Sequence, residues 1–157
     1  MSQNNEFVHV PASTGFMYWG PGDSYTVLVT GAQSGGSYFM IDCLVPPGGG
    51  PPPHLHEREE EAFFLLQGSV ALVVGEQIIH AGPGDFVHIP RQTVHTFQNN
   101  GTETVRMLAI FSPAGMEGWF AEAYGPALDR TATPPPPSPE MLARMVAAAP
   151  KYGVVFA

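Results

Sequence analysis

The sequence predicts an all-β fold, a barrel or a sandwich of antiparallel strands. Short runs rich in β-branched and aromatic residues recur along the chain, and 18 glycines and 17 prolines punctuate them. Such runs are typical of strands, and many strands at near-regular spacing favour a sheet that closes on itself or packs on a second sheet. The expected strands are residues 24–30, 38–45, 61–67, 69–74, 76–81, 85–90, 94–99 and 104–111.

The breaks between these strands carry turn residues. The Gly-Glu pair at 75–76 suits a two-residue hairpin, and Gly-Pro-Gly at 82–84 suits a tight loop. The Asn-Asn-Gly segment at 99–101 is predicted to form a turn that requires positive φ.

Two helices are expected after the last strand. The first lies around residues 114–125 and is expected to cover an open side of the barrel. Its apolar face consists of Met116, Trp119, Phe120 and Ala123. The second begins with Ser138 as N-cap and Pro139 at the first helical position, and it ends before Pro150. Residues 134–137, all proline, are predicted to form a stiff extended spacer.

Composition and charge limit the partners. With 44% hydrophobic and 13% charged residues, the 157-residue chain can bury a substantial core in one domain. Its net charge is −8 and no basic stripe is present, so nucleic acid is not an expected partner. No apolar run is long enough to cross a membrane, and the first residues lack the features of a secretion signal. We therefore expect no membrane partner and a cytoplasmic location. Cys43, the single cysteine, is expected to be a small buried hydrophobe.

Three histidines and one glutamate form a candidate metal site: His54, His56, Glu61 and His95. Because successive side chains alternate on a strand, both imidazoles of the His-x-His pair point to the same face. Imidazole together with a carboxylate suits iron, nickel, copper, manganese or zinc, and the set contains no sulfur ligand. The sequence therefore predicts a divalent transition metal without choosing among these five. Four protein ligands on an octahedral ion would leave two positions open for catalysis.

The spacing of these residues resembles the two signature motifs of the cupin superfamily. Residues 48–68 read G-x5-H-x-H-x4-E-x6-G, and residues 84–99 read G-x5-P-x4-H-x3-N. The resemblance implies a double-stranded β-helix, the jelly-roll or cupin barrel, with short C-terminal helices. It also implies a small single-domain protein similar to the quercetin dioxygenase-like cupins, with a ligand set of His54, His56, Glu61 and His95.

Two details of the motifs leave alternatives open. Gln92 stands where the second motif usually has glycine. A residue with a Cβ adopts positive φ at a cost that glycine avoids, so the resemblance does not predict the turn after Pro90. Glu59 and Glu60 are alternative carboxylates, but only Glu61 has the motif spacing.

Strand alternation predicts an apolar pocket around the metal. Side chains that share a face with Glu61, share a face with His95, or point inward from the strand at 104–111 should line it. The expected pocket residues are Phe63, Leu65, Phe97, Met107, Ala109 and Phe111. None of the six basic residues is expected to face the metal, which disfavours phosphorylated substrates and favours a neutral aromatic or enolic ligand.

Three functions are compatible with these residues. The resemblance favours a metal-dependent dioxygenase for a small aromatic or enolizable substrate, with Glu61 as both ligand and catalytic base. A cupin isomerase, epimerase or lyase would use the same site without oxygen. A non-enzymatic module that binds a small molecule is the third reading, because a fold does not determine a function.

The chain is expected to form a single domain with three parts. Residues 1–37 form an N-terminal arm and the first strands, residues 38–112 the cupin barrel core with both motifs, and residues 113–157 a helical C-terminal extension packed on the barrel. The resemblance also implies a homodimer, in which the apolar side chains of the arm at residues 7–10 could cover a sheet edge of the partner.

Overall fold

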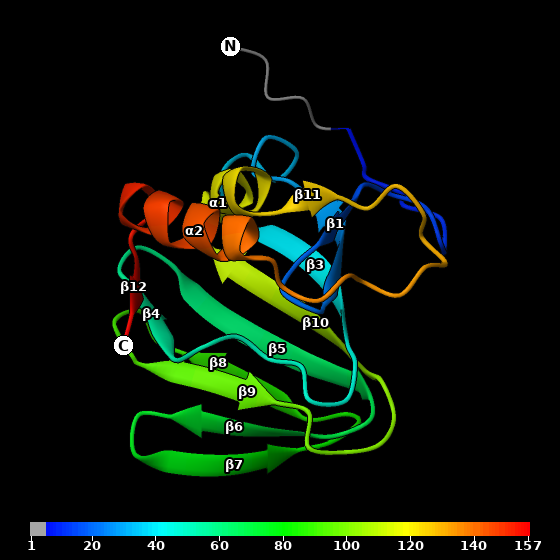
Figure 1. Cartoon of the computed structure of the whole chain (residues 1–157). Helices are drawn as coiled ribbons and strands as arrows, with labels where there is room; N and C mark the ends of the chain where they lie inside the picture. The colour runs from blue at the N-terminus through cyan, green and yellow to red at the C-terminus, as the bar shows by residue number, and fades with distance from the viewer. Residues whose placement is uncertain (1–5) are drawn as a thin grey trace.

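The computed structural model describes residues 6–157, so residues 1–5 of the predicted arm lie outside the described residues. It contains two antiparallel sheets, one of seven strands in the order β11-β1-β2-β3-β10-β5-β8 and one of five in the order β12-β4-β9-β6-β7 (Figure 1). The strands are β1 (Met17–Trp19), β2 (Ser24–Val29), β3 (Phe39–Val45), β4 (His54–His56), β5 (Glu60–Gln67), β6 (Val70–Val74), β7 (Gln77–Ala81), β8 (Phe86–Ile89), β9 (His95–Gln98), β10 (Val105–Ser112), β11 (Gly125–Pro126) and β12 (Val154–Phe156). The expected jelly-roll fold is confirmed.

The eight predicted strands are all present, each end within one residue of the prediction. Strand β4 is the one assumed for the His-x-His pair, and the short strands β1, β11 and β12 were not predicted. None exceeds three residues, which is too short for alternation to show in the sequence. They form because distant partners supply their hydrogen bonds: β11 pairs with β1, and β12 pairs with β4.

The core lies between the two sheets and follows the predicted alternation. On β3, Phe39 and Ile41 are buried, and they lie opposite Phe111 and Ala109 of β10 in the strand register. The rings of Phe39 and Phe111 stack with their centroids 5.9 Å apart. Cys43, on the same face of β3, is buried as expected, and burial raises the pKa of its thiol.

Two helices and a single 3₁₀ turn complete the described chain: α1 (Met116–Ala123), α2 (Pro139–Ala148) and η1 (Ala149–Tyr152). Helices α1 and α2 lie side by side at one end of the molecule (Figure 1). The face that α1 buries is the predicted one. The hydroxyl of Ser138 caps α2 by accepting from the Met141 backbone N–H at 3.1 Å, as expected. Neither helix of residues 6–157 is long and apolar enough to cross a membrane.

The turns agree with the sequence in one case and differ in another. Gly75, at the hairpin between β6 and β7, has a φ of 58° as a two-residue hairpin requires. The expected positive φ in residues 99–101 is wrong, because none of these residues adopts it. The buried Asn99 side chain holds this turn instead, donating to the carbonyls of Val45 and Glu103 and accepting from Gly101 N–H. Because the Asn99 side chain makes hydrogen bonds that the backbone of a tight turn would otherwise make, this turn does not require a residue in the left-handed region.

Gln92 keeps a left-handed conformation despite its side chain. Its φ is 65°, and its backbone N–H donates to the carbonyl of His56 at 2.7 Å. This hydrogen bond joins the turn of the second motif to the strand that carries two of the candidate ligands. The departure from glycine therefore leaves the turn in place.

Gly50 is expected to tolerate no side chain, because a Cβ there would lie 2.0 Å from the backbone oxygen of Phe97. We predict that Gly50→Ala lowers the free energy of unfolding by about 2–4 kcal/mol, from overpacking and from a φ of +145° together. Gly48→Ala is the matched control. Its φ is +80° but no atom lies within 4 Å, so only about 1 kcal/mol should be lost. Urea unfolding of both variants checks this, and equal losses would contradict it.

Candidate metal centre and its cavity

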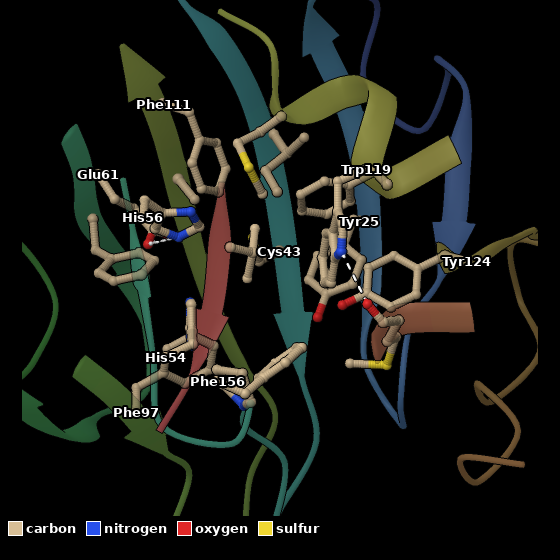
Figure 2. A pocket seen from close by; sticks show the side chains of 18 residues that line it. Tyr25, Cys43, His54, His56, Glu61, Phe97, Phe111, Trp119, Tyr124 and Phe156 are labelled. Atoms are coloured by element: carbon tan, nitrogen blue, oxygen red, sulfur yellow. Dashed lines mark hydrogen bonds and ion pairs between the residues drawn. The ribbon is translucent and has the colours of Figure 1, made fainter. Parts of the chain in front are cut away.

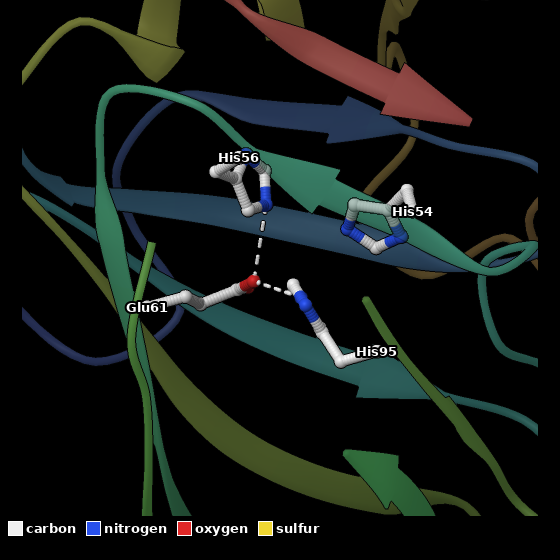
Figure 3. Close-up of side chains that lie close together, drawn as sticks. All are labelled: His54, His56, Glu61 and His95. Carbon is white, nitrogen blue, oxygen red and sulfur yellow. Dashed lines mark hydrogen bonds and ion pairs between the residues drawn. The ribbon is translucent and has the colours of Figure 1, made fainter. Parts of the chain in front are cut away.

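The four candidate ligands meet at one point between the sheets. His54 and His56 come from β4, His95 from β9 and Glu61 from β5. The register places His54 directly opposite His95, which brings their rings to 4.5 Å between centroids. One ligand atom from each of the four residues lies within 4.8 Å of the other three (Figure 3).

Glu61 is the centre of this cluster. Its Oε2 accepts from Nε2–H of His95 at 2.8 Å and from Nε2–H of His56 at 3.2 Å. Burial alone would raise the pKa of Glu61, but these two hydrogen bonds hold it well below its usual range. The same contact raises the pKa of His95 against the effect of burial. The site therefore holds an ionised carboxylate whose other oxygen, Oε1, takes part in neither contact.

The outer nitrogens of two imidazoles are held by backbone oxygens. Nδ1 of His54 lies 2.9 Å from the carbonyl of Pro52, and Nδ1 of His95 lies 2.9 Å from the carbonyl of Thr93. Such contacts fix the ring; they leave Nε2 of His54 free to bind a metal, and Nε2 of His95 becomes free when it loses its proton and its contact with Glu61. Burial lowers the pKa of His54 to about 4, so its imidazole is neutral at pH 7. The four residues are thus positioned to bind a divalent metal, and their imidazole and carboxylate donors suit a first-row transition ion.

A cavity of about 60 Å³ lies beside the cluster. In Figure 2 His56 and Glu61 lie at one side of this cavity, Tyr25, Trp119 and Tyr124 at the other, and Cys43 between them. Aromatic rings make up much of its lining, and no lysine or arginine among the described residues lines it. The arrangement offers one polar end for chelation and apolar walls for a ring.

The structure divides the predicted pocket residues into two groups. The cavity is lined by Phe63, Phe97, Ala109 and Phe111, which share it with the candidate ligands. Leu65 and Met107 are fully buried but lie in the core outside the cavity wall. All six point inward, because alternation determines the face but not the depth along the strand.

Several cavity residues were not assigned to the pocket from the sequence. Met116, Trp119 and Phe120 of α1 close one end, and the sequence did place them on a helix face that covers the barrel. Val154 and Phe156 arrive from the C-terminal strand β12. No local pattern marks these two, since only the pairing of β12 with β4 brings Val154 opposite His56 and Phe156 opposite His54.

Fold and site together define a small jelly-roll protein with a His₃Glu cluster inside its barrel. The family model described as Cupin domain (Cupin_2) matches residues 42–111, which contain all four cluster residues. Residues 42–111 therefore carry a cupin domain match, and the fold around them is a jelly roll.

Comparison with known proteins gives further similarities. A stretch of 58 residues is 33% identical to quercetin 2,3-dioxygenase of Bacillus subtilis, covering 37% of this chain but only 17% of that enzyme. KdgF from Halomonas sp. has a similar structure, with a TM-score of 0.63 and 17% identity over 73% of this chain and 99% of that one. A sugar phosphate isomerase from Silicibacter pomeroyi has a TM-score of 0.52 and 18% identity over 71% of this chain and 74% of that one. The two structural matches show the fold alone.

Proposed function

We propose that the protein is a dioxygenase-type oxidoreductase that acts on a small aromatic or enolizable substrate. The observation that carries this proposal is a His₃Glu cluster at the wall of an aromatic-rich cavity whose described lining holds no basic residue. The partial similarity to quercetin 2,3-dioxygenase supports oxygen chemistry. When bound, an iron, nickel, copper, manganese or zinc ion would supply Lewis acidity toward a chelating hydroxyl, and the redox-active ions also dioxygen chemistry.

The residues have distinct roles in this proposal. His54, His56 and His95 hold the metal, and Glu61 is both the fourth ligand and the catalytic base. Glu61 Oε1 would accept the proton of a substrate hydroxyl within hydrogen-bond distance, because Oε2 is directed at the imidazoles.

The apolar walls orient the substrate and exclude water. Phe63, Phe97 and Phe111 would pack against it, since their rings line the cavity next to Glu61 and the histidines, and Ala109 leaves room between them. Leu65 and Met107 would act behind this wall by holding the strands that carry it.

Cavity size narrows the substrate class. A volume of about 60 Å³ is small beside the roughly 300–1,000 Å³ typical of drug-sized ligand pockets. A substrate of one ring or one β-diketone unit suits this space better than a three-ring flavonol. A flavonol would require Phe156 and Pro51, the half-buried residues of the lining near His54, to move.

The test is oxygen consumption by metal-loaded protein. We expect dioxygen uptake with acetylacetone or catechol, slower uptake with quercetin, and none with protein stripped by a chelator. Product analysis under argon is the matched control, because an oxygenase makes no product there. Uptake that is unchanged after metal removal would contradict the proposal.

A metal-dependent isomerase, epimerase or lyase is the second candidate. The same four ligands could hold the metal of such an enzyme, and the fold similarity to a sugar phosphate isomerase is compatible with this class. The lack of lysine and arginine in the described cavity lining argues against phosphorylated substrates, which usually require such a clamp. Product formed under argon would favour this class. A ligand that binds the metal site without turnover in either atmosphere would favour a binding module.

A homodimer and a cytoplasmic location belong to the same proposal. Phe7 is 91% exposed in the N-terminal arm, which leaves it available to a second copy of the chain. Light scattering of the intact chain and of a Phe7→Ser variant tests the dimer, which the variant should weaken.

A further inference from the structure

Two buried polar atoms beside the metal cluster have no hydrogen-bond partner within residues 6–157. They are Nδ1 of His56 and Oε2 of Glu59. Buried polar atoms are nearly always paired, so each of these requires an explanation. His56 is also the exception in its cluster, since Nδ1 of His54 and of His95 each contact a backbone oxygen.

Glu59 lies three residues after His56, in the short connection from β4 to β5, and its side chain is turned inward. It is only 3% exposed. A Cβ on Gly115 would lie 3.3 Å from its Oε1, so the carboxylate lies under the start of α1. The next residue, Glu60, points outward to His88 and Arg91 at the surface.

The surroundings of Glu59 bring it within electrostatic reach of His56. Burial raises the pKa of the Glu59 carboxyl, and the strongest opposing influence is the charge of His56. Two unpartnered polar atoms are thus buried three residues apart in the chain, one at the end of β4 and the other just before β5.

We propose that Glu59 is the positioning residue of His56 in the metal-loaded protein, where its carboxylate accepts the Nδ1–H of that imidazole through one buried water. The contact keeps the proton on Nδ1 and directs Nε2 at the metal, as carboxylate partners of metal-binding histidines do. This inference rests on the metal site of the proposed function, but not on the reaction proposed for it.

If Glu59 stabilised the fold rather than the metal site, its replacement would lower the stability of the metal-free protein. A buried carboxylate with an unpaired oxygen destabilises the fold instead, so an apolar side chain of the same length should be tolerated or preferred there. Glu59→Met should therefore leave the metal-free protein as stable as before or more stable, and weaken metal binding only.

The experiment measures the Kd of the full-length protein for Zn²⁺ by competition with a chromophoric chelator, together with the Tm of the metal-free form. We expect a Kd about 10- to 100-fold higher for Glu59→Met at an unchanged or higher Tm. Glu59→Gln should fall between this variant and the wild type, because an amide oxygen accepts but carries no charge. Glu60→Met, which alters the adjacent exposed carboxylate, is the matched control and should keep the wild-type Kd.

Three results would overturn the inference. These are a Glu59→Met Kd equal to that of Glu60→Met, a metal-free Tm that falls in step with the affinity, or a Glu59→Gln variant that binds Zn²⁺ no better than Glu59→Met. Because Zn²⁺ affinity is read without turnover, failure of the oxygenase proposal would leave this result unaffected. Loss of Zn²⁺ binding in the wild type would overturn both.

Discussion

His95→Ala is expected to abolish metal retention and, with it, turnover. The substitution removes one ligand and leaves the buried Glu61 with a single imidazole partner, at 3.2 Å. Loss of the hydrogen-bond partner of a metal ligand already costs about 10- to 100-fold in metal affinity or activity. Loss of the ligand itself should cost at least the upper end of that range. Elemental analysis and oxygen uptake of protein purified without a metal-binding tag measure the effect. The matched control is His88→Ala. His88 is half-exposed and paired with Glu60 at the surface, so this variant should keep its metal.

Glu61→Ala separates binding from catalysis. The base role predicts that turnover per bound metal falls by about 100-fold or more, the usual contribution of a general base. Metal should be assayed in the same sample, because a carboxylate ligand is lost together with the base. A variant that retains metal and turns over at the wild-type rate would contradict the role of Glu61 as base.

Asp23→Asn is expected to stabilise the protein at alkaline pH by on the order of 2–4 kcal/mol, from a shift of roughly three pKa units. The Asp23 side chain is completely buried; its Oδ2 accepts from the Tyr25 hydroxyl at 3.2 Å and its Oδ1 has no partner. Burial raises the pKa of this carboxyl to about 7, and the Tyr25 hydrogen bond opposes only part of the shift.

The sign follows from comparison of the two states. In the unfolded chain the Asp23 carboxyl ionises with a pKa of about 3.9, so the folded state binds its proton more tightly. The stability from this group is fully present below about pH 4, is lost as the pH rises toward 7, and stays lost above that. An asparagine cannot ionise, so the free energy of unfolding of the variant should rise relative to that of the wild type as the pH increases over this range.

Urea unfolding at pH 4 and pH 8 checks the prediction as a difference between variant and wild type at each pH. The difference should be near zero at pH 4 and large at pH 8. Asp85→Asn removes the same charge at an exposed position and should show no such change. An advantage of Asp23→Asn that is equal at both pH values would mean that ionisation is not its cause.

The candidate ligands could be named from the sequence because two of them share one strand and the other two have the spacing of the cupin motifs. Strand alternation brings the His54 and His56 imidazoles to one face, and motif spacing separates Glu61 from Glu59 and Glu60. The same alternation predicted the buried faces of β5 and β10. It did not distinguish Phe63, which lines the cavity, from Leu65 two residues further, which is packed into the core. That distinction depends on what lies across the barrel.

The resemblance to the cupin motifs implied the jelly roll and the four candidate ligands. The sequence patterns by themselves determined an all-β fold of barrel or sandwich type, the inward faces of the strands and the helix face that covers the barrel. These follow from periodicities of two and 3.6 residues and from turn chemistry, which act over a few neighbouring positions. Only the tertiary structure decided how the cavity is closed. Pairing of β12 with β4 brings Phe156 to the site, and the start of α1 covers the β4–β5 connection in which Glu59 is buried. Both depend on long-range contacts whose free energy comes from burial of residues far apart in the chain, and no local pattern encodes those partners.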